Sequence, residues 1–260
     1  MIKNLKIFWL FATYSMKTTL QNKVGLVLFT LGKLIRFGTF FFFVFYLLSN
    51  TELLAGYTLN QTIVFFLTYN IVDSLAQLLF REVYRFRFLV VSGDLNTVLV
   101  KPYHPFMRIL VGGIDIMDAF ISVIYMILVT YFIFQLPGIS WINILMYLLM
   151  IVNGLLIAAG FHIAVLALGV LTTEVDHTVM IYRDMTRLAT FPVDIYKQPL
   201  QFIFTFIIPI GIMMTFPVKS LLNLLSPTIY AICFTLSITA FISSIKLWDY
   251  ALKRYQSWGG

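Results

Sequence analysis

The sequence predicts an all-α integral membrane protein, with an N-terminal amphipathic helix at the membrane surface followed by six transmembrane helices. Of the 260 residues, 60% are hydrophobic and only 11% are charged, and the mean hydropathy is +0.93. Soluble domains contain about 45–50% apolar and about 25% charged residues. The chain also contains 26 Phe and 14 Tyr, more aromatic surface than one water-soluble core could bury. Lipid is therefore the expected solvent for most of the fold.

The formal net charge of +7 raises the question of nucleic-acid binding. In membrane proteins an excess of Lys and Arg marks the cytoplasmic loops and attracts anionic lipid headgroups. We therefore predict membrane lipids as a partner, and no nucleic acid. Because Cys233 is the single cysteine, no intrachain disulfide can form. The three histidines are far apart and no HExxH pattern is present, so no metal site is predicted.

The first helix is expected over residues 1–23. Lys3 and Lys6 precede an apolar run, as in a signal peptide, but no small-residue cleavage site follows it. On a helix the apolar residues form one stripe and the lysines lie mostly away from it, which is typical of a helix lying in the membrane interface. The stripe consists of Ile2, Leu5, Phe8, Trp9, Ala12, Met16 and Leu20.

Six later segments are candidates for membrane spans, which need about 20 mainly apolar residues. The fifth is short and contains Pro209 and Gly211. Broken helices are tolerated at membrane depth where they pack against protein or line a cavity. We therefore expect residues 202–226 to form a broken span that runs into a partly re-entrant segment. The predicted spans are residues 24–48, 61–80, 109–134, 141–170, 202–216 and 227–247.

The distribution of positive charge predicts the orientation of these spans. With the N-terminus in the cytoplasm, Lys219 is the one cation among the 18 Lys and Arg residues that falls in an outside loop. The opposite orientation would place nearly all of them outside, against the positive-inside rule. We therefore predict a cell-membrane protein with both termini cytoplasmic, and with a second polar stretch, residues 172–201, on the cytoplasmic side.

A polar island, residues 81–108, separates the second and third predicted spans. It is rich in arginine and lysine and contains a Gly-Asp-Leu-Asn turn that leads to Lys101-Pro102. A long cationic insert of this kind should face the cytoplasm. It is also large enough to fold and to be held by a partner, so we expect an energy-supplying protein to dock here. Its cations are Arg81, Arg85, Arg87, Lys101 and Arg108.

The chain itself lacks a phosphate-binding loop of the GxxxxGK[ST] type. The Gly32-Lys33 pair is followed by Leu34 and lies within the first span. ATP cannot bind by that mechanism, so any ATP dependence must come from a partner. We accordingly predict that the chain is not an enzyme and that it carries no cofactor of its own.

Charged residues inside the predicted spans are candidates for a transport path, because membrane-embedded charges are costly and are commonly functional. Lys33 and Arg36 lie one turn apart on one face of the first span. They could reach the headgroups or pair within the bundle, or they could line a polar path. Asp115 and Asp118 share one face near the start of the third span, where they could form structural pairs or contact a substrate or ion.

An alternative function uses the same acidic residues. Asp73, Asp115, Asp118 and His162 could together form a proton relay in an ion- or proton-coupled secondary transporter. Such transporters typically show inverted repeats and midplane carboxylates. The two halves of this sequence show no convincing repeat, and the acidic residues cluster near the predicted span ends.

Three motifs occur in order along the chain. They are SGDLN at residues 92–96 leading to Lys101-Pro102, FPVDIY at residues 191–196 followed by Pro209 and Pro217, and Trp248 followed by RYQSWG at residues 254–259. With these motifs the whole chain resembles the permease subunits of ABC-2 type exporters, in the subfamily without a fused ATPase domain. Similar permeases carry G-x-L-D-x-x-L-x-[KR]-P in the first motif, so Asn96 stands where Asp is usual.

This resemblance implies a single ABC-2 transmembrane domain over residues 1–260, which acts as a homodimer or heterodimer with a second permease. It implies an elbow helix at residues 1–23 and a short coupling helix within residues 81–108 that sits in a groove of a cytosolic ATPase. ATP and Mg would bind that ATPase. The coupling residues would be Gly93, Asp94, Leu95, Asn96, Lys101 and Pro102.

The resemblance also implies a gate near the extracellular side, formed around residues 202–226 with Pro192, Pro209 and Pro217. Together with Lys33, Arg36, Asp115 and Asp118, these prolines are our candidates for the gate and the path. Substrate identity and the direction of transport do not follow from the sequence.

Overall fold

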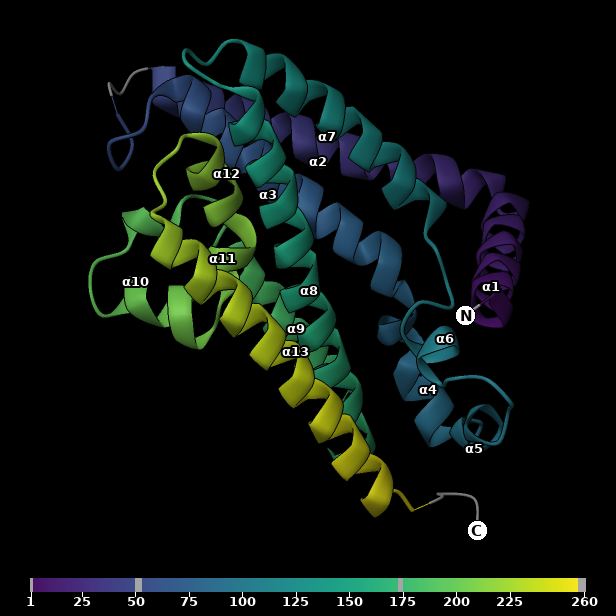
Figure 1. The fold of residues 1–260 in the computed structure, drawn as a ribbon. Helices are drawn as coiled ribbons and strands as arrows, with labels where there is room; N and C mark the ends of the chain where they lie inside the picture. Colours follow the sequence, from purple (N-terminus) through teal and green to yellow (C-terminus); the bar gives the residue numbers. More distant parts are fainter. Residues whose placement is uncertain (1, 50–52, 173–174, 257–260) are drawn as a thin grey trace.

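A computed structural model describes residues 2–49, 53–172 and 175–256. Five helices in these ranges are long and apolar enough to cross a membrane, and the described chain forms no β-strand beyond one isolated bridge. Five of the six predicted spans are thereby confirmed as long helices (Figure 1). These are α2 (Lys23–Ser49), α3 (Leu59–Phe80), α7 (Ile116–Phe134), α8 (Trp141–Thr172) and α13 (Pro227–Arg254).

Helix α8 is the centre of the fold. It packs along α13 and also contacts α3, α9 (Val175–Arg187), α11 (Ile210–Met214) and α12 (Phe216–Leu221). Gly154 allows the closest approach, because a Cβ at this position would lie 2.6 Å from the carbonyl oxygen of Met213. A larger side chain there would separate α8 from α11.

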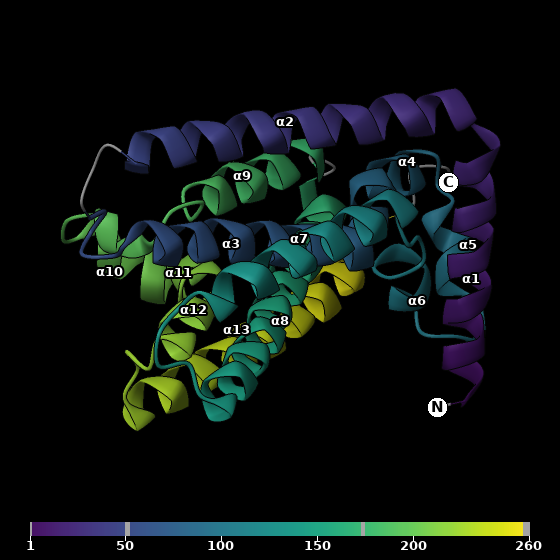
Figure 2. The ribbon, with the colours of Figure 1, turned by 90° about the horizontal axis from the view of Figure 1, so that it is seen from above.

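Helix α2 lies at the outside of the bundle. In its most apolar 18-residue window only 6% of the residues are buried within the chain, against 72% for α3. Figure 2 shows α2 along one edge of the molecule, with α9 and α3 beneath it and α1 (Ile2–Gln21) crosswise at one end. The apolar outer face of α2 is therefore left for lipid or for another protein.

Helix α1 confirms that the first 20 or so residues are helical. Ala12 is buried, and the Ser15 hydroxyl donates a hydrogen bond to the carbonyl oxygen of Ile114 at 3.0 Å. Trp9 and Leu10 are exposed on the outer side. Met1 and the side chains of Ile2, Lys3 and Leu5 lie outside the part of the chain that the structure describes. The location of α1 in a membrane interface stays a prediction.

The third long helix begins later than the sequence predicts. Residues 110–115 are not helical, and α7 starts at Ile116 with Asp115 as its N-cap, whose Oδ1 accepts a hydrogen bond from the Met117 amide at 2.9 Å. The expectation that Asp115 lies about two turns inside a helix from 109 to 134 is therefore wrong. Gly113 lies in this non-helical stretch and leaves room for the Glu82 carboxylate, since a Cβ there would lie 2.1 Å from it.

The second polar stretch also differs from its predicted position. Near its start Asp176 pairs with Arg87 of the polar island at 2.7 Å. Near its end Asp194 pairs with Lys219 at 2.6 Å and accepts a hydrogen bond from the Tyr57 hydroxyl at 3.1 Å. Tyr57 precedes α3 and the island follows it, so α9 and the 3-10 turn η2 (Val193–Ile195) connect opposite ends of the molecule.

The prediction that all of residues 172–201 lie at the island end is therefore wrong. Helix α9 is short and polar, but it is amphipathic. Its buried residues are spaced three or four apart, so that this face packs on neighbouring helices while the polar face turns away. The chain passes from one end of the molecule to the other through this segment, whereas the sequence alone indicates a cytoplasmic loop.

The predicted break in residues 202–226 is confirmed, although this segment does not cross the molecule. It begins beside Asp194, to which Gln201 donates a hydrogen bond at 3.1 Å, and it ends at Ser226, the N-cap of α13. The other end of α13 lies against the island, where Trp248 packs on Phe106. The segment thus begins and finishes at the same end of the molecule. It comprises α10 (Leu200–Phe202), a π-helical turn (Ile203–Ile207), α11 and α12.

Candidate functional site

A cavity of about 850 Å³ lies beneath α2. Its walls come from α2, α3, α7, α9 and the loop after α9. One part of the lining is charged and another part is aromatic. The charged and aromatic residues are Lys33, Arg36, Asp73, Asp118, Arg183, Arg187, Phe37, Phe40, Phe43, Phe66, Tyr69, Tyr125, Phe191 and Tyr196.

Lys33 of α2 and Asp118 of α7 form an ion pair in the wall of the cavity. Asp118 is buried, and its backbone carbonyl accepts a hydrogen bond from the Ser74 hydroxyl of α3 at 3.0 Å. The Lys33 ammonium also lies 4.8 Å from the centre of the Phe29 ring. For these residues the formation of an ion pair and the lining of a polar cavity were predicted as alternatives. In the structure they form an ion pair that also lines the cavity.

Arg36 is placed differently from Lys33. It is the midpoint of α2, with 13 helical residues on each side, or about 20 Å of helix in both directions. Among the described residues Arg36 forms no hydrogen bond or ion pair, and it lines the cavity. It is a cation in the middle of a long apolar helix, and in the part of the chain that the structure describes it pairs with no carboxylate.

Helix α9 adds two more cations to the wall. Arg187 pairs with Asp184 on the same helix at 2.9 Å. Arg183 lies over the Tyr84 ring at 5.8 Å, and it acts electrostatically on the Asp73 carboxylate. Asp73 also accepts a hydrogen bond from Gln77 at 2.7 Å. Within the described ranges Asp118 is the cavity carboxylate that forms an ion pair, whereas Asp73 has Gln77 as its hydrogen-bond partner and forms no ion pair with Arg36 or Arg183.

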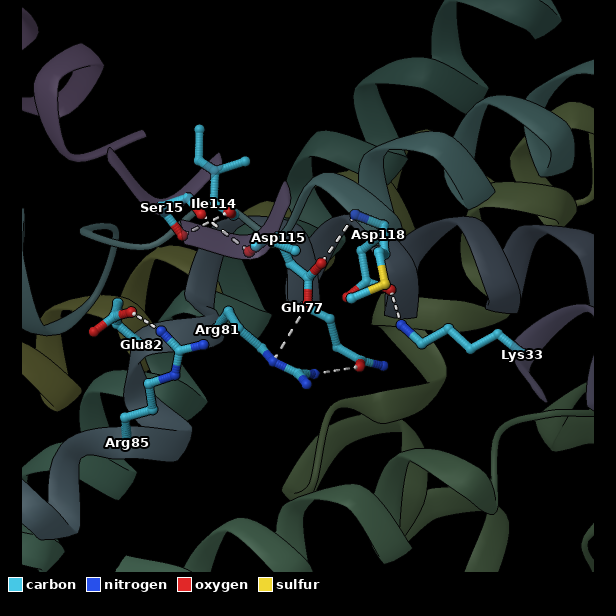
Figure 3. A network of polar contacts seen from close by, with 11 residues as sticks. Ser15, Lys33, Gln77, Arg81, Glu82, Arg85, Ile114, Asp115 and Asp118 are labelled. Carbon is cyan, nitrogen blue, oxygen red and sulfur yellow. Dashed lines mark hydrogen bonds and ion pairs between the residues drawn. The ribbon is translucent and has the colours of Figure 1, made fainter. Parts of the chain in front are cut away.

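A polar network lies at the island end of the cavity (Figure 3). Arg81 reaches Asp115 at 3.5 Å and Gln77 at 3.4 Å, and Figure 3 shows it between these two side chains. Glu82 is buried and accepts hydrogen bonds from Arg85 at 2.9 Å and Arg108 at 2.6 Å. The network ties the end of α3 to the island and to the start of α7.

The four residues of the alternative function do not form one relay. Asp73 and Asp118 line the cavity, but Asp115 pairs with Arg81 outside its lining. His162 is buried against Phe80 and Tyr182, and its Nδ1 lies 2.7 Å from the Ala158 carbonyl oxygen. It does not line the cavity. The secondary-transporter alternative has no support from this arrangement.

The polar island folds into short helices: η1 (Arg81–Arg85), α4 (Phe86–Val91), α5 (Leu95–Leu99) and α6 (Phe106–Ile109). Gly93 has φ +76°, which favours glycine, in the turn before α5. Leu95 is buried, whereas Asp94 at the start of α5, Asn96 and Lys101 with Pro102 after it are exposed. Figure 1 shows these short helices together at one end of the molecule.

The predicted gate prolines gather in the buried segments at the other end. Pro192 precedes η2, Pro209 precedes α11 and Pro217 lies in the first turn of α12, and all three are buried. The Val193 amide donates a hydrogen bond to the Thr215 hydroxyl at 3.2 Å. Nearby, burial and the Asp194 carboxylate raise the pKa of the Tyr57 hydroxyl above its ordinary value.

The comparison with protein families identifies this arrangement. The family model described as "ABC-2 family transporter protein" matches residues 34–259. The chain belongs to this family. It is therefore a multi-pass membrane permease of an ABC transporter, and the family implies an ATPase partner. No curated protein sequence and no solved structure matches the chain.

In this ABC-2 permease the sequence motifs did not single out Glu82, Arg183 and Arg187. Glu82 is the one acidic residue among the arginines at the start of the island, a signal that could have indicated a shared partner. For α9 the signal is periodicity: Val175, Val179, Tyr182 and Thr186 recur every three or four residues. Residues 257–259 of the third motif lie outside the described residues.

Proposed function

We propose that this permease is half of an ATP-driven exporter, and that a cytosolic ATPase docks on the polar island. The observation that supports this most directly is that several large apolar side chains are exposed on a charged insert. Phe88 is 71% exposed and Val100 is 83% exposed, and Val91 between them is also exposed. Exposed apolar groups rimmed by charge are typical of protein-interaction sites. Helix α5, with Asp94, Leu95 and Asn96, is the proposed coupling helix.

The contacts of the island suggest how ATPase closure would reach the cavity. Glu82 holds η1 and Arg108 together, and Arg87 connects the island to Asp176 of α9. Phe86 and Phe106 pack on Trp248 of α13. A displacement of the island would therefore act on α3, α9 and α13 together. ATP supplies the difference in affinity that favours one state over the other.

A second permease, the same or homologous, is the proposed partner on the exposed side of α2, and residues 202–226 form the proposed gate. Both termini are proposed to be cytoplasmic, because the island and the C-terminal end of α13 share one end of the molecule with most of the positive charge. Asn96, in place of the usual Asp, marks a contact that suits a particular ATPase.

Affinity isolation of the full-length permease from its own membrane in mild detergent tests this function. We expect an ATPase to co-purify with the wild-type chain. Lys101→Glu should abolish co-purification, because it reverses charge beside the coupling helix, and Gly93→Val should weaken it by straining the positive φ. Lys253→Glu, an exposed cation on α13, is the matched control and should retain the ATPase.

The amount of each variant in the membrane is measured in the same experiment, because the island variants should insert normally. Reproducible absence of an ATPase from the wild-type preparation would contradict the proposal. So would full substrate-stimulated ATPase activity in the Lys101→Glu complex, since the coupling segment would then be unnecessary.

A further inference from the structure

The cavity beneath α2 has the features of a binding site for an amphiphile that carries one compact anionic group. We propose that the permease binds such a compound, through a phosphate, sulfate or carboxylate at Arg36 and an apolar or aromatic body against the aromatic wall. This deepens the proposed function, on which its role as the transported substrate rests.

The charged residues of the cavity lining indicate that the ligand has an anionic group. Four cations and two carboxylates face the cavity. Lys33 is paired with Asp118 and Arg187 with Asp184, while Arg183 acts on Asp73. Among the described residues Arg36 and Arg183 both lack an ion pair, and Arg36 is the one of the two that lies in the long apolar helix α2. A charge at the centre of a membrane helix is costly unless it is paired or faces a water-filled path, so its position is best explained by a ligand that supplies the anion.

The size of the cavity and its aromatic wall indicate that the ligand also has an apolar or aromatic part. A volume of about 850 Å³ is within the range of cavities that bury a drug-sized ligand. Phe37 and Phe40 both pack on Phe66, with ring centroids 5.7 Å apart for Phe37 and Phe66 and 5.3 Å for Phe40 and Phe66. Phe40 follows Arg36 by one turn of α2, so the cation and the aromatic wall are adjacent.

A small inorganic anion would use only one part of this site, and a cation would meet the surplus positive charge. The arrangement therefore favours a compound with both an anionic and an apolar part. Such compounds reach a transporter either as membrane lipids or as water-soluble amphiphiles, and both present the same chemistry to Arg36.

Titration calorimetry on the full-length permease in phosphatidylcholine nanodiscs tests the assignment, with empty nanodiscs as the blank. The probes are 2-naphthyl phosphate, neutral 2-naphthol, cationic 2-naphthylmethylamine and inorganic phosphate. We expect naphthyl phosphate to bind most tightly. Arg36→Gln should weaken it about tenfold or more, as expected for loss of a charged hydrogen bond. Arg36→Lys should stay within about threefold of the wild type because the charge remains.

Lys253→Gln, which removes an exposed cation far from the cavity, is the control and should bind like the wild type. Arg36→Gln should keep its elution volume and its melting temperature, because Arg36 forms no hydrogen bond or ion pair with any described residue. Equal affinity of Arg36→Gln and wild type would overturn the proposal. Equal binding of the naphthyl amine would overturn the anionic class, and equal binding of inorganic phosphate would overturn the amphiphile.

Phosphatidylglycerol added to the nanodiscs distinguishes the two sources. Competition with naphthyl phosphate supports a lipid, and unchanged binding supports a water-soluble amphiphile. The experiments can also refute the exporter proposal and the anionic-amphiphile proposal independently of each other. Naphthyl phosphate binding without a co-purifying ATPase would support the anion site and contradict the exporter. A co-purifying ATPase without any anion binding would support the permease–ATPase complex and overturn the substrate class.

Discussion

The polar island and the α9 crossing (residues 175–195) are similar in composition, but they accommodate their charges in different ways. The island buries one carboxylate, Glu82, between two arginines and leaves most of its other charges at the surface. The α9 crossing runs the length of the bundle, with apolar residues on α8 and its cations toward a cavity. A polar segment therefore need not be a loop outside the bundle when its charges can face an internal cavity.

The largest expected effect separates the two regions by their side of the membrane. In a Cys233→Ala background, Thr97→Cys on the island and Lys197→Cys after η2 should react with a membrane-impermeant maleimide from opposite sides. The reason is that Asp176 lies at the island and Asp194 lies at Tyr57 and Lys219. Labelling of intact and permeabilised cells measures this. Labelling of both positions from one side would refute the crossing.

The next largest effect is expected inside the island. Glu82→Gln leaves Arg85 and Arg108 without their shared buried carboxylate, and because both arginines are partly exposed we expect a cost of about 2–3 kcal/mol from the lost charged hydrogen bonds. We expect a lower melting temperature in detergent and less folded protein. Asp249→Asn, an exposed carboxylate on α13, is the matched control. If both variants melt alike, the buried carboxylate is not what holds the island together.

A smaller effect is expected where the α9 crossing ends. Asp194→Ala removes the partner of Lys219 and the acceptor for Tyr57 and Gln201. The pair is only partly buried, with side-chain exposures of 16% for Lys219 and 20% for Asp194, so we expect a loss of about 2 kcal/mol. Thermal unfolding measures it. Lys219→Met should cost less, because Tyr57 and Gln201 keep their acceptor, and the reverse order would argue against this arrangement.

The smallest effect is expected where the two regions meet. Arg87 and Asp176 are 58% and 51% exposed, and exposed pairs contribute about 0.2–1 kcal/mol. Arg87→Gln and Asp176→Asn should therefore leave stability almost unchanged. A double-mutant cycle isolates the pair. A coupling energy as large as that of the Glu82 pairs would mean that the island is fixed to α9 much more firmly than the exposed contact suggests.

Most of the long helices could be predicted from the sequence because apolar length is a local property. The spans at α2, α3, α8 and α13 follow from long, mainly hydrophobic runs, and the break in residues 202–226 follows from Pro209 and Gly211. The late start of α7 could not be predicted, because the apolar run already begins at Ile109, while in the fold the Glu82 carboxylate lies against Gly113 in the non-helical stretch. That contact joins residues 31 positions apart.

The candidate site was predicted only in its separate parts. Lys33, Arg36 and Asp118 were candidates because charges in apolar helices are costly, and all three line the cavity. Asp115 and His162 were candidates for the same reason, but they lie outside it. Arg183 and Arg187 were absent from the prediction, because a polar segment between two apolar runs indicates a loop until its packing is known.

By itself the sequence determined that the chain is a helical membrane protein without an ATP-binding loop, since hydrophobicity and short motifs are read from neighbouring residues. The packing of distant segments shows which polar segment crosses the bundle and which charged residues line the cavity. Both depend on pairs of residues far apart in the chain, such as Asp194 with Lys219 and Lys33 with Asp118. Pairing and burial determine where a charge is stable, and neither is encoded locally.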